Sequence, residues 1–237
     1  MTSGRKVPRI MLVSRGEERN NMAQHELLRN RIEQHKIKNI LSKIDDKDMK
    51  QCSQATVELL KEQYPNHIFT IKYSLSFEEI TSYAGLPLLD DFKGRKILPD
   101  GGVIWMDNKY PILITEIKHQ GTNKERIAEG KKKQATGNAI ERYGKNLMAL
   151  QTMFSNDTIL PAAVFCWGSD FCEDETTVLA KLYCLNNFHP LNKIYEETVK
   201  GVKPHNVFYQ EEKWSNEEIV NIMYTLSTVY ISYYLRE

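Results

Sequence analysis

Residues 99–118 read PDGGVIWMDNKYPILITEIK: a Pro-Asp-Gly-Gly motif, two apolar runs, and then a Glu and a Lys two residues apart. The runs 103–105 and 112–117 consist largely of residues that favour β-strands, and the Asp-Asn-Lys sequence at 107–109 favours a turn. This stretch predicts a β-hairpin.

The predicted hairpin would bring three polar side chains together. If its turn centres on Asn108, position 100 falls opposite position 116, and directly paired residues keep their Cβ atoms roughly 4.5–5.5 Å apart. Because strand side chains alternate, Glu116 and Lys118 share one face, while Ile117 points to the other face, toward a core. We therefore expect Asp100, Glu116 and Lys118 to converge.

These three residue types suit metal-dependent hydrolysis of a phosphodiester. Mg²⁺ typically takes one or two protein carboxylates and several waters, so Asp100 and Glu116 match its demand. A hard cation can supply the attacking water and neutralise phosphoryl charge, and Lys118 could orient that water and stabilise the pentacovalent phosphorus. The alternative is an ordinary surface turn and an exposed Glu-x-Lys pair, since such short spacings recur by chance.

A two-faced helix is predicted to begin near residue 137. At about 100° per residue, one face collects apolar side chains and the opposite face collects polar ones. The apolar positions are Ile140, Tyr143, Leu147, Leu150 and Phe154, and the polar positions are Asn138, Glu141, Arg142 and Lys145. Asn and Arg are well suited to base edges. Alternatively, Asn138 caps the helix with Glu141 as its capping-box partner, and Glu141 pairs with Lys145.

The charge of the chain is concentrated locally. The whole chain has a formal net charge of +1, which does not indicate a polyanionic partner. From residue 118 to residue 145, however, eight Lys or Arg residues stand against three Glu residues. Phosphate contacts would require such a basic stretch, although a solvated charged loop would also explain it.

Three strings resemble the EcoRI-type type II restriction endonucleases, which belong to the wider PD-(D/E)XK nuclease superfamily. ILPDGGV at 97–103 resembles the first catalytic strand of that family, EIKHQG at 116–121 the second, and GNAIER at 137–142 its recognition helix. Weaker similarity covers most of the chain beyond about residue 30.

The resemblance implies a role for each matching residue. Asp100 and Glu116 would bind Mg²⁺ together with the backbone carbonyl of Ile117, and Lys118 would assist the attacking water. The residues that would read the inner AATT bases are Gly137, Asn138, Ala139, Glu141 and Arg142.

The same resemblance implies an activity and partners. The chain would be a Mg²⁺-dependent homodimeric type II site-specific deoxyribonuclease that cuts double-stranded DNA at a short palindrome with an AATT core. The site would be GAATTC or a variant in the outer pair, and the cuts would leave 5′-phosphate ends with 5′ overhangs. A companion DNA methyltransferase, not held in a stable complex, would protect the host genome.

Two departures from the family pattern bear on specificity. The connection between Gly121 and Gly137 is shorter than in the family, which suggests a trimmed DNA-embracing arm. Residues 191–196, LNKIYE, offer one basic residue and one acid where the family has arginines that help to read the outer pair. The inner AATT is therefore better supported than the full GAATTC.

Composition predicts one α/β domain over residues 1–237, in which residues 1–20 form a flexible arm. The chain is 41% hydrophobic, which is enough for one substantial core. It lacks both an apolar run of about 18 residues and a signal-peptide pattern, so we expect a cytoplasmic prokaryotic protein without a membrane partner. The four cysteines lack metal-binding or disulfide spacing and are expected to be reduced and mostly buried.

The expected architecture is a mixed central β-sheet flanked by helices. Beyond the hairpin and the two-faced helix, we expect helices at 22–43, at 47–63, after Ser76 with Glu79 as capping-box partner, and after Ser215 with Glu218. Further strands are expected at 67–73, 159–167 and 179–185. Strand alternation turns His119 away from Lys118, which favours a structural role for it.

Two other functions fit parts of this pattern. A repair or structure-selective nuclease could use the same scaffold, but it would not need the base-reading face of Asn138 and Arg142. A DNA-binding module without catalysis would be expected to lack a member of the catalytic trio, yet Asp100, Glu116 and Lys118 are all present.

Overall fold

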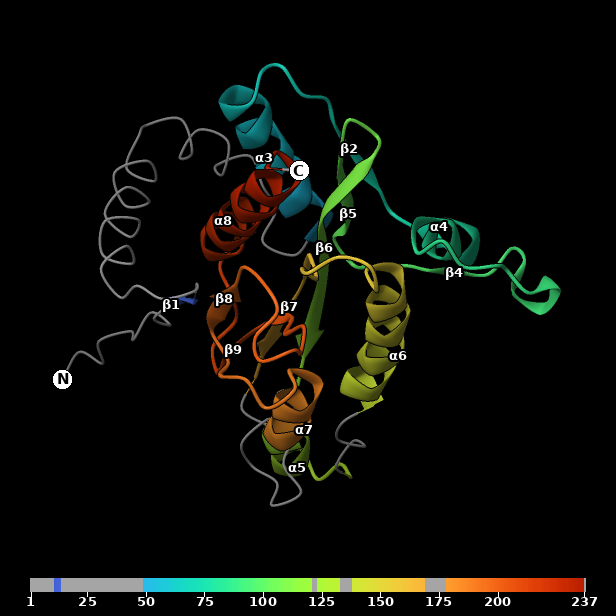
Figure 1. Ribbon diagram of the computed structural model, residues 1–237. Coiled ribbons are helices and arrows are strands. Elements are labelled where there is room, and N and C mark those ends of the chain that lie inside the picture. Colours follow the sequence, from blue (N-terminus) through green and yellow to red (C-terminus); the bar gives the residue numbers. More distant parts are fainter. Residues whose placement is uncertain (1–10, 14–48, 121–122, 133–137, 169–177, 237) are drawn as a thin grey trace.

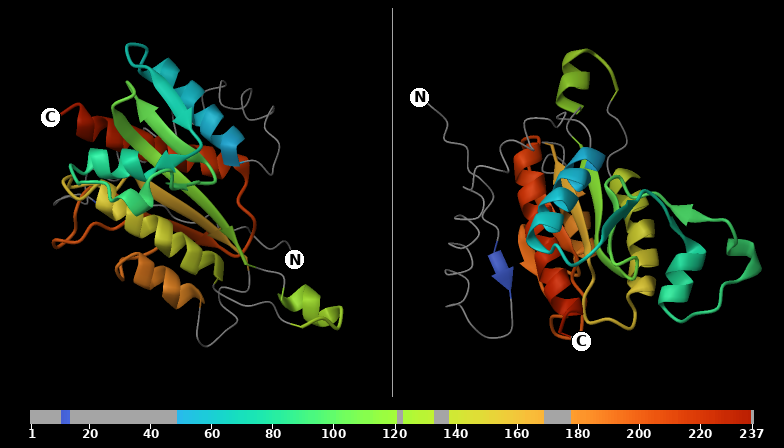
Figure 2. Two further views of the ribbon diagram at one scale, coloured as in Figure 1. Left: turned by 90° about the vertical axis from the view of Figure 1, so that its right-hand side faces the viewer. Right: turned by 90° about the horizontal axis from the view of Figure 1, so that it is seen from above.

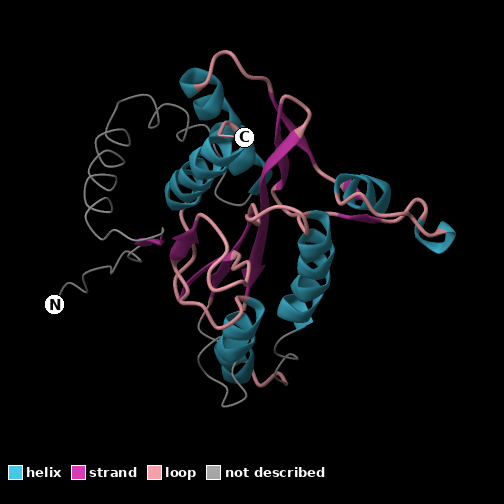
Figure 3. Cartoon of the chain, viewed as in Figure 1, coloured by secondary structure: helices cyan, strands magenta, loops and turns pink. Residues whose placement is uncertain are grey.

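The computed structural model describes residues 11–13, 49–120, 123–132, 138–168 and 178–236. Its centre is a mixed five-stranded sheet with the order β2-β5-β6-β7-β9 (Figure 3). These strands are β2 (Phe69–Lys72), β5 (Gly102–Met106), β6 (Tyr110–His119), β7 (Ala162–Trp167) and β9 (Asn206–Gln210). The pairs β2–β5 and β5–β6 are antiparallel, whereas the pairs β6–β7 and β7–β9 are parallel. The predicted mixed sheet is confirmed.

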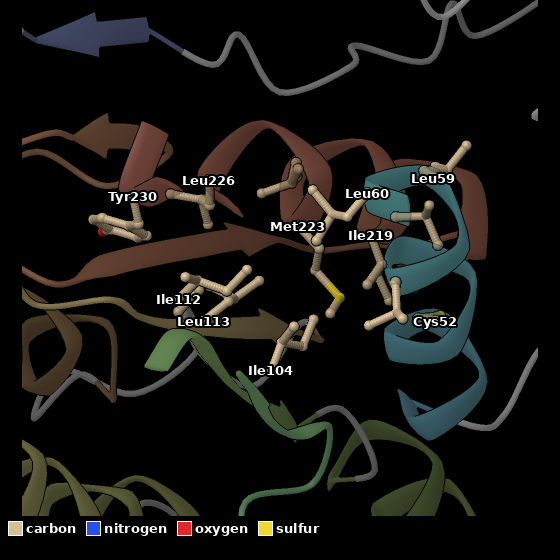
Figure 4. Packing of buried hydrophobic residues seen from close by; sticks show 14 of the residues in the cluster. Cys52, Leu59, Leu60, Ile104, Ile112, Leu113, Ile219, Met223, Leu226 and Tyr230 are labelled. Atoms are coloured by element: carbon tan, nitrogen blue, oxygen red, sulfur yellow. The ribbon is translucent and has the colours of Figure 1, made fainter. Parts of the chain in front are cut away.

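Helices cover both faces of this sheet (Figures 1 and 2). On one face lie α3 (Met49–Gln63) and α8 (Asn216–Tyr234), which pack against each other and on the sheet. Figure 4 shows their apolar side chains, Leu60 and Met223 among them, in one cluster with Leu113 of β6. The other face is covered by α6 (Asn138–Met153). Because β6 is central and covered on both faces, it is an almost continuous apolar run.

The remaining elements lie around this sandwich. A lobe that projects beside α6 contains β3 (Leu75–Ser76), α4 (Phe77–Tyr83), the 3₁₀ turn η1 (Asp90–Phe92) and β4 (Lys96–Ile97). At another end lie α5 (Asn123–Ala128) and α7 (Val178–Leu185). The short strand β1 (Met11–Val13) pairs in parallel with β8 (Lys193–Tyr195).

The predicted hairpin is β5 and β6, but its register differs by one residue from the expectation. Its turn has positive φ at Asp107 and Asn108, residue types that tolerate this conformation. Beyond the turn, the register shifts between Ile104 and Trp105, where Pro111 stands opposite Trp105. Proline lacks a ladder N–H and is typically found in sheets at such irregularities.

As a consequence, the expected pairing of positions 100 and 116 is wrong. The last pair of the ladder is Gly102 with Thr115, and Asp100 lies two residues before β5 begins. Extending this register places position 100 nearest to position 117 rather than to position 116.

Two helix starts were predicted correctly from their capping residues. Ser76 caps α4 and Ser215 caps α8, each with the reciprocal bond from the third helical residue, Glu79 or Glu218. The helix expected at 47–63 is α3, and the strand expected at 67–73 contains β2. The helix expected at 22–43 and most of the arm expected at 1–20 lie outside the described residues.

One predicted strand is wrong. Residues 179–185 belong to helix α7, not to a strand. The segment VLAKLYCL contains Leu, Ala and Lys, which favour helices, and only one β-branched residue. Its buried residues Val178 and Leu182 are four apart, which is the helical spacing.

The cysteine expectation holds where it can be followed. Cys52 and Cys166 are buried thiols and Cys184 is an exposed one, none of them in a disulfide, while Cys172 lies outside the described residues. Within the described part of the chain, no helix has both the length and the apolar character that crossing a membrane requires.

Candidate active site

Asp100, Glu116 and Lys118 converge at one end of the β5–β6 hairpin, as their spacing predicted. The Lys118 Nζ atom lies 2.7 Å from Asp100 Oδ2 and 2.6 Å from Glu116 Oε2. Glu116 is almost fully buried, with 3% of its surface exposed, whereas 40% of the Asp100 side chain remains exposed. The ammonium group therefore bridges two carboxylates at a site that is open on the Asp100 side.

The one-residue change in register determines how Asp100 reaches this site. The Ile117 backbone N–H donates to Asp100 Oδ2 at 3.0 Å. The Ile117 side chain packs on the opposite side, against the core between the sheet and α3 and α8. Strand alternation thus separates Glu116 and Lys118 from Ile117 as expected.

A fourth residue, Asn146, completes the surroundings of Glu116. Its Nδ2 atom donates to Glu116 Oε1 at 2.8 Å, so Asn146 and Lys118 occupy different oxygens of the same carboxylate. Asn146 lies on α6, next to the buried Leu147 at the border of the apolar face. The sequence pattern gave only one sign of this residue, which is a polar side chain that flanks the buried face of the predicted helix.

The two carboxyls hold their protons differently. Burial raises the pKa of Glu116 to about 7, and contact with Asp100 adds to the rise. For Asp100 burial acts in the same direction, but hydrogen bonds with Glu116 and Lys118 outweigh it and lower the pKa. Burial works against the charge on Lys118, yet the Glu116 carboxylate raises the pKa of that ammonium group. Near neutral pH Asp100 and Lys118 are charged, and Glu116 is partly protonated.

The donor set fits a hard divalent cation. The Lys118 ammonium group lies between the carboxylates of Asp100 and Glu116, so the space between these two carboxylates favours positive charge. Oxygen ligands of this number and kind are what Mg²⁺ takes from proteins, with waters completing its shell. Among the described residues, no group of three or more His, Cys, Asp or Glu side chains is placed to hold a metal ion, so at this site a backbone carbonyl and waters would have to complete the shell begun by the two carboxylates.

The predicted recognition segment begins α6, the helix that also carries Asn146. Glu141 and Arg142 are exposed, and Glu141 Oε1 lies 3.0 Å from Lys181 Nζ of α7. The pairing of Glu141 with Lys145 considered from the sequence is thus replaced by a tertiary one. Gly137 and the side chains of Asn138 and Ala139 lie outside what the structure describes. All five apolar positions expected on this helix are buried: Ile140, Tyr143, Leu147, Leu150 and Phe154.

His119 lies away from this site. Its ring stacks on Trp167 with a centroid distance of 3.6 Å and an interplanar angle of 14°. The partner comes from β7, where Trp167 pairs with His119 in the sheet register. This packing agrees with the expected structural role.

Comparison with known proteins gives a family. Residues 33–237 match the family described as restriction endonuclease EcoRI. The type II restriction enzyme RsrI of Cereibacter sphaeroides is 30% identical over 152 residues, and the type II restriction enzyme EcoRI of Escherichia coli is 27% identical over 156 residues. These alignments cover 56% and 58% of this chain but only about half of each relative, 54% and 56% respectively. Since the family match covers most of the chain, including the whole β5–β6 hairpin and α6, this chain belongs to the EcoRI family of restriction endonucleases.

Proposed function

We propose that this chain is a Mg²⁺-dependent type II restriction endonuclease, a site-specific deoxyribonuclease that makes double-strand cuts in DNA. The observation that carries the proposal is the bridging of Asp100 and Glu116 by Lys118 at the end of one hairpin. Two relatives named as type II restriction enzymes support the reaction class.

Each residue of the trio has a chemical role in this proposal. Asp100, Glu116 and the backbone carbonyl of Ile117 hold the cation. When bound, Mg²⁺ neutralises charge on the phosphoryl oxygens and provides an activated water. Lys118 orients the attacking water and stabilises the charge that grows on the phosphoryl group. Asn146 holds Glu116 by one carboxylate oxygen, and so limits the directions in which the other can face.

The proposed target is a short palindrome with an AATT core, either GAATTC or a variant in its outer pair. This proposal rests on the GNAIER segment at 137–142 and on the exposed position of Glu141 and Arg142 at the start of α6. A bidentate Arg contact to a purine and an Asn contact to adenine discriminate bases by about 1–3 kcal/mol each. The proposed products carry 5′-phosphates and 5′ overhangs.

A palindromic target implies a homodimer. Two equivalent half-sites are read by a two-fold symmetric pair of chains, each cutting one strand. A companion DNA methyltransferase, acting separately on the same sequence, would protect host DNA. Light scattering on the purified chain, alone and with a duplex containing the site, would test the dimer; a monomer in both samples would contradict it.

Digestion of DNA of known sequence tests activity and specificity together. With Mg²⁺, we expect discrete fragments whose termini, once sequenced, share an AATT core. Fragments with dispersed ends would contradict the specificity, and preferential cutting of branched over linear substrates would favour a structure-selective nuclease instead. A failure to nick or cut plasmid DNA at any Mg²⁺ concentration would leave a DNA-binding module without catalysis.

Lys118→Ala tests the catalytic assignment. Removing the ammonium group should reduce the cleavage rate by about 100- to 1,000-fold, as loss of a charge-stabilising donor does in other enzymes. Specific DNA binding, measured by gel shift in Ca²⁺, should remain. Normal cleavage by this variant would show that the trio is not the catalytic centre.

Arg142→Ala tests the reading of bases. We expect its preference for the specific site over a site with one changed base to fall about 10- to 100-fold, which corresponds to a contact of about 1–3 kcal/mol. Lys61→Ala, which removes an exposed cation from α3 on the opposite face of the sheet, is the matched control and should leave the preference unchanged. Equal preferences in the Arg142 variant and the wild type would assign recognition elsewhere.

A further inference from the structure

The turn that carries Asp100 is held on its N–H side by the chain around it. Gly102 N–H donates to Pro99 O at 3.0 Å, which closes the turn, and Gly101 N–H donates to Thr115 O at 3.0 Å, which ties it to β6. Both bonds use N–H groups of the turn, so neither satisfies the Gly101 carbonyl. The partner of that carbonyl lies outside the hairpin.

That partner is Ser53, a fully buried residue in the second turn of α3. Its Oγ atom lies 2.6 Å from Gly101 O and 3.2 Å from Met49 O, the carbonyl one turn earlier in its own helix. A hydroxyl has one proton to donate, and the shorter distance gives it to Gly101. Thr56, one turn further along, shows the ordinary alternative: its hydroxyl bonds the carbonyl of Cys52 within the helix at 2.9 Å.

The fit around Gly101 is tight on both sides. A Cβ atom at this position would lie 2.0 Å from Thr115 Oγ1, 3.0 Å from Ser53 Oγ and 3.2 Å from Met49 Cγ. Only glycine leaves room for α3 and β6 to approach the turn so closely. The turn is therefore clamped between a helix and a strand, and Ser53 provides the hydrogen bond of the helix side.

The helix that provides this bond is itself anchored. Cys52, next to Ser53, contacts Asn216 Oδ1 at the start of α8 with its Sγ atom at 3.5 Å. Apolar packing joins α3 and α8, with Leu60 beside Met223 (Figure 4). Through Ser53, the turn that carries Asp100 is attached to the layer formed by α3 and α8 as well as to the sheet.

We infer that Ser53 is a positioning residue for Asp100, which holds the carboxylate at the separation from Glu116 that a divalent cation requires. The inference rests on the proposed function of this site. Glu116 is held by Asn146 from α6 on one face of the sheet, and the Asp100 turn is held by Ser53 from α3 on the other face. One carboxylate is thus held directly by a half-buried donor from α6, and the turn that carries the other is held by a buried donor from α3.

The test compares Ser53→Ala with Thr56→Val in the full chain. Both variants remove a buried hydroxyl from the same helix, but only the first removes a bond to the catalytic turn. Titration calorimetry with Mg²⁺, and with Ca²⁺ as a second cation, should show an affinity about tenfold lower for Ser53→Ala, the size expected when an outer-shell partner of a ligand is lost. Thr56→Val should bind as the wild type does.

Two further measurements assign the effect to the proposed centre. Asp100→Asn should abolish the titration signal, which shows that the heat comes from this site. In cleavage assays Ser53→Ala should show a lower kcat at limiting Mg²⁺ with an unchanged KM for DNA, and a tenfold increase in Mg²⁺ should restore kcat.

The outcomes separate the inference from the function on which it rests. Wild-type affinity in Ser53→Ala, or an equal loss in Thr56→Val, would overturn the positioning role. No binding of Mg²⁺ by the wild type in the presence or absence of DNA would overturn the proposed function, and the inference with it. Urea unfolding of each variant shows whether a lost affinity follows lost stability.

Discussion

Asp100 and Glu116 differ in protonation although both carboxyls contact the same ammonium group. Asp100 is partly exposed and accepts from a backbone N–H as well as from Lys118, so its charged form is stabilised. Glu116 is buried, and its charge is opposed by burial and by the neighbouring carboxylate. A divalent cation at this position would add enough positive charge to ionise both groups, so binding of the cation and loss of a proton are expected to be coupled.

This coupling predicts a pH-dependent affinity for the cation. Because the pKa of Glu116 is raised to about 7, the metal-free protein keeps a proton that a free glutamic acid would have lost. Below pH 7 the apparent Mg²⁺ affinity should fall by up to about tenfold per pH unit, and above about pH 8 it should be constant. Calorimetry in buffers of different ionisation enthalpy should detect release of about half a proton at pH 7.

Glu116→Gln is the control for this effect. It cannot release the proton, so its weaker binding should not change with pH in the same range. Binding by the wild type that is independent of pH and of the buffer would contradict the assignment of the raised pKa to a cation-binding carboxylate.

At the residue scale the sequence predicted which side chains converge but not how. Alternation along the strand was enough to place Glu116 and Lys118 on one face. The register shift beside Pro111 was not foreseen, and it moves Asp100 next to the Ile117 N–H. Ser53 also escaped prediction, because a serine near the start of an amphipathic helix gives no local sign of a partner 48 residues away.

At the scale of elements, α6 serves both the core and the site. Its apolar face, predicted from helical periodicity, is buried at every expected position. Arg142 and Asn146 are four residues apart, so they lie on neighbouring turns of one side of the helix. The first is exposed at the proposed DNA-reading end, and the second contacts Glu116. One helix therefore links the proposed recognition residues to the proposed catalytic carboxylates.

Asn146→Ala should weaken the catalytic centre without unfolding the helix. The change removes the donor that holds Glu116 Oε1 at 2.8 Å, and alanine is a better helix former than asparagine. We expect Mg²⁺ affinity and cleavage rate to fall about 10- to 100-fold. Thr152→Ala, at an exposed position of the same helix where the hydroxyl bonds Met148 O of that helix, should leave both quantities unchanged. If the two variants behave alike, Asn146 has no part in the site.

Helix α7 shows where local patterns mislead. A short apolar run does not by itself distinguish a strand from a buried helix segment, and 179–185 was assigned to a strand for that reason. The capping boxes of α4 and α8 were more informative, because a capping box requires two specific side chains three residues apart.

At the scale of the whole molecule, the packing of helices on the sheet encloses His205, a group that would otherwise titrate. His205 is fully buried just before β9, 5.8 Å from the Tyr143 ring of α6 between ring centroids. Neither of its ring nitrogens has a hydrogen-bond partner among the described residues. Burial lowers the pKa of His205 to about 3, so the folded chain keeps this imidazole neutral. The sequence showed six scattered histidines and could not show which of them the fold would enclose.

This burial predicts that acid destabilises the fold through His205. In the unfolded chain the imidazole has its ordinary pKa of about 6.5 and takes up a proton as the pH falls, whereas in the folded chain it does not until about pH 3. The unfolded state therefore binds more protons between these values, and stability is lost as the pH falls through them. From pH 7 to pH 5 this group alone should remove about 2 kcal/mol from the free energy of unfolding. The raised pKa of Glu116 acts in the opposite direction in part of this range, so the comparison must be made against a variant that changes only the histidine.

Two variants at position 205 provide this comparison. His205→Phe keeps a ring beside Tyr143 and cannot titrate, and His205→Leu provides a second non-titrating side chain. Urea unfolding of the three proteins at pH 7, 6 and 5 should give a wild-type curve that falls more steeply with acid than either variant. Parallel curves would mean that His205 is protonated in the folded chain and has a partner there.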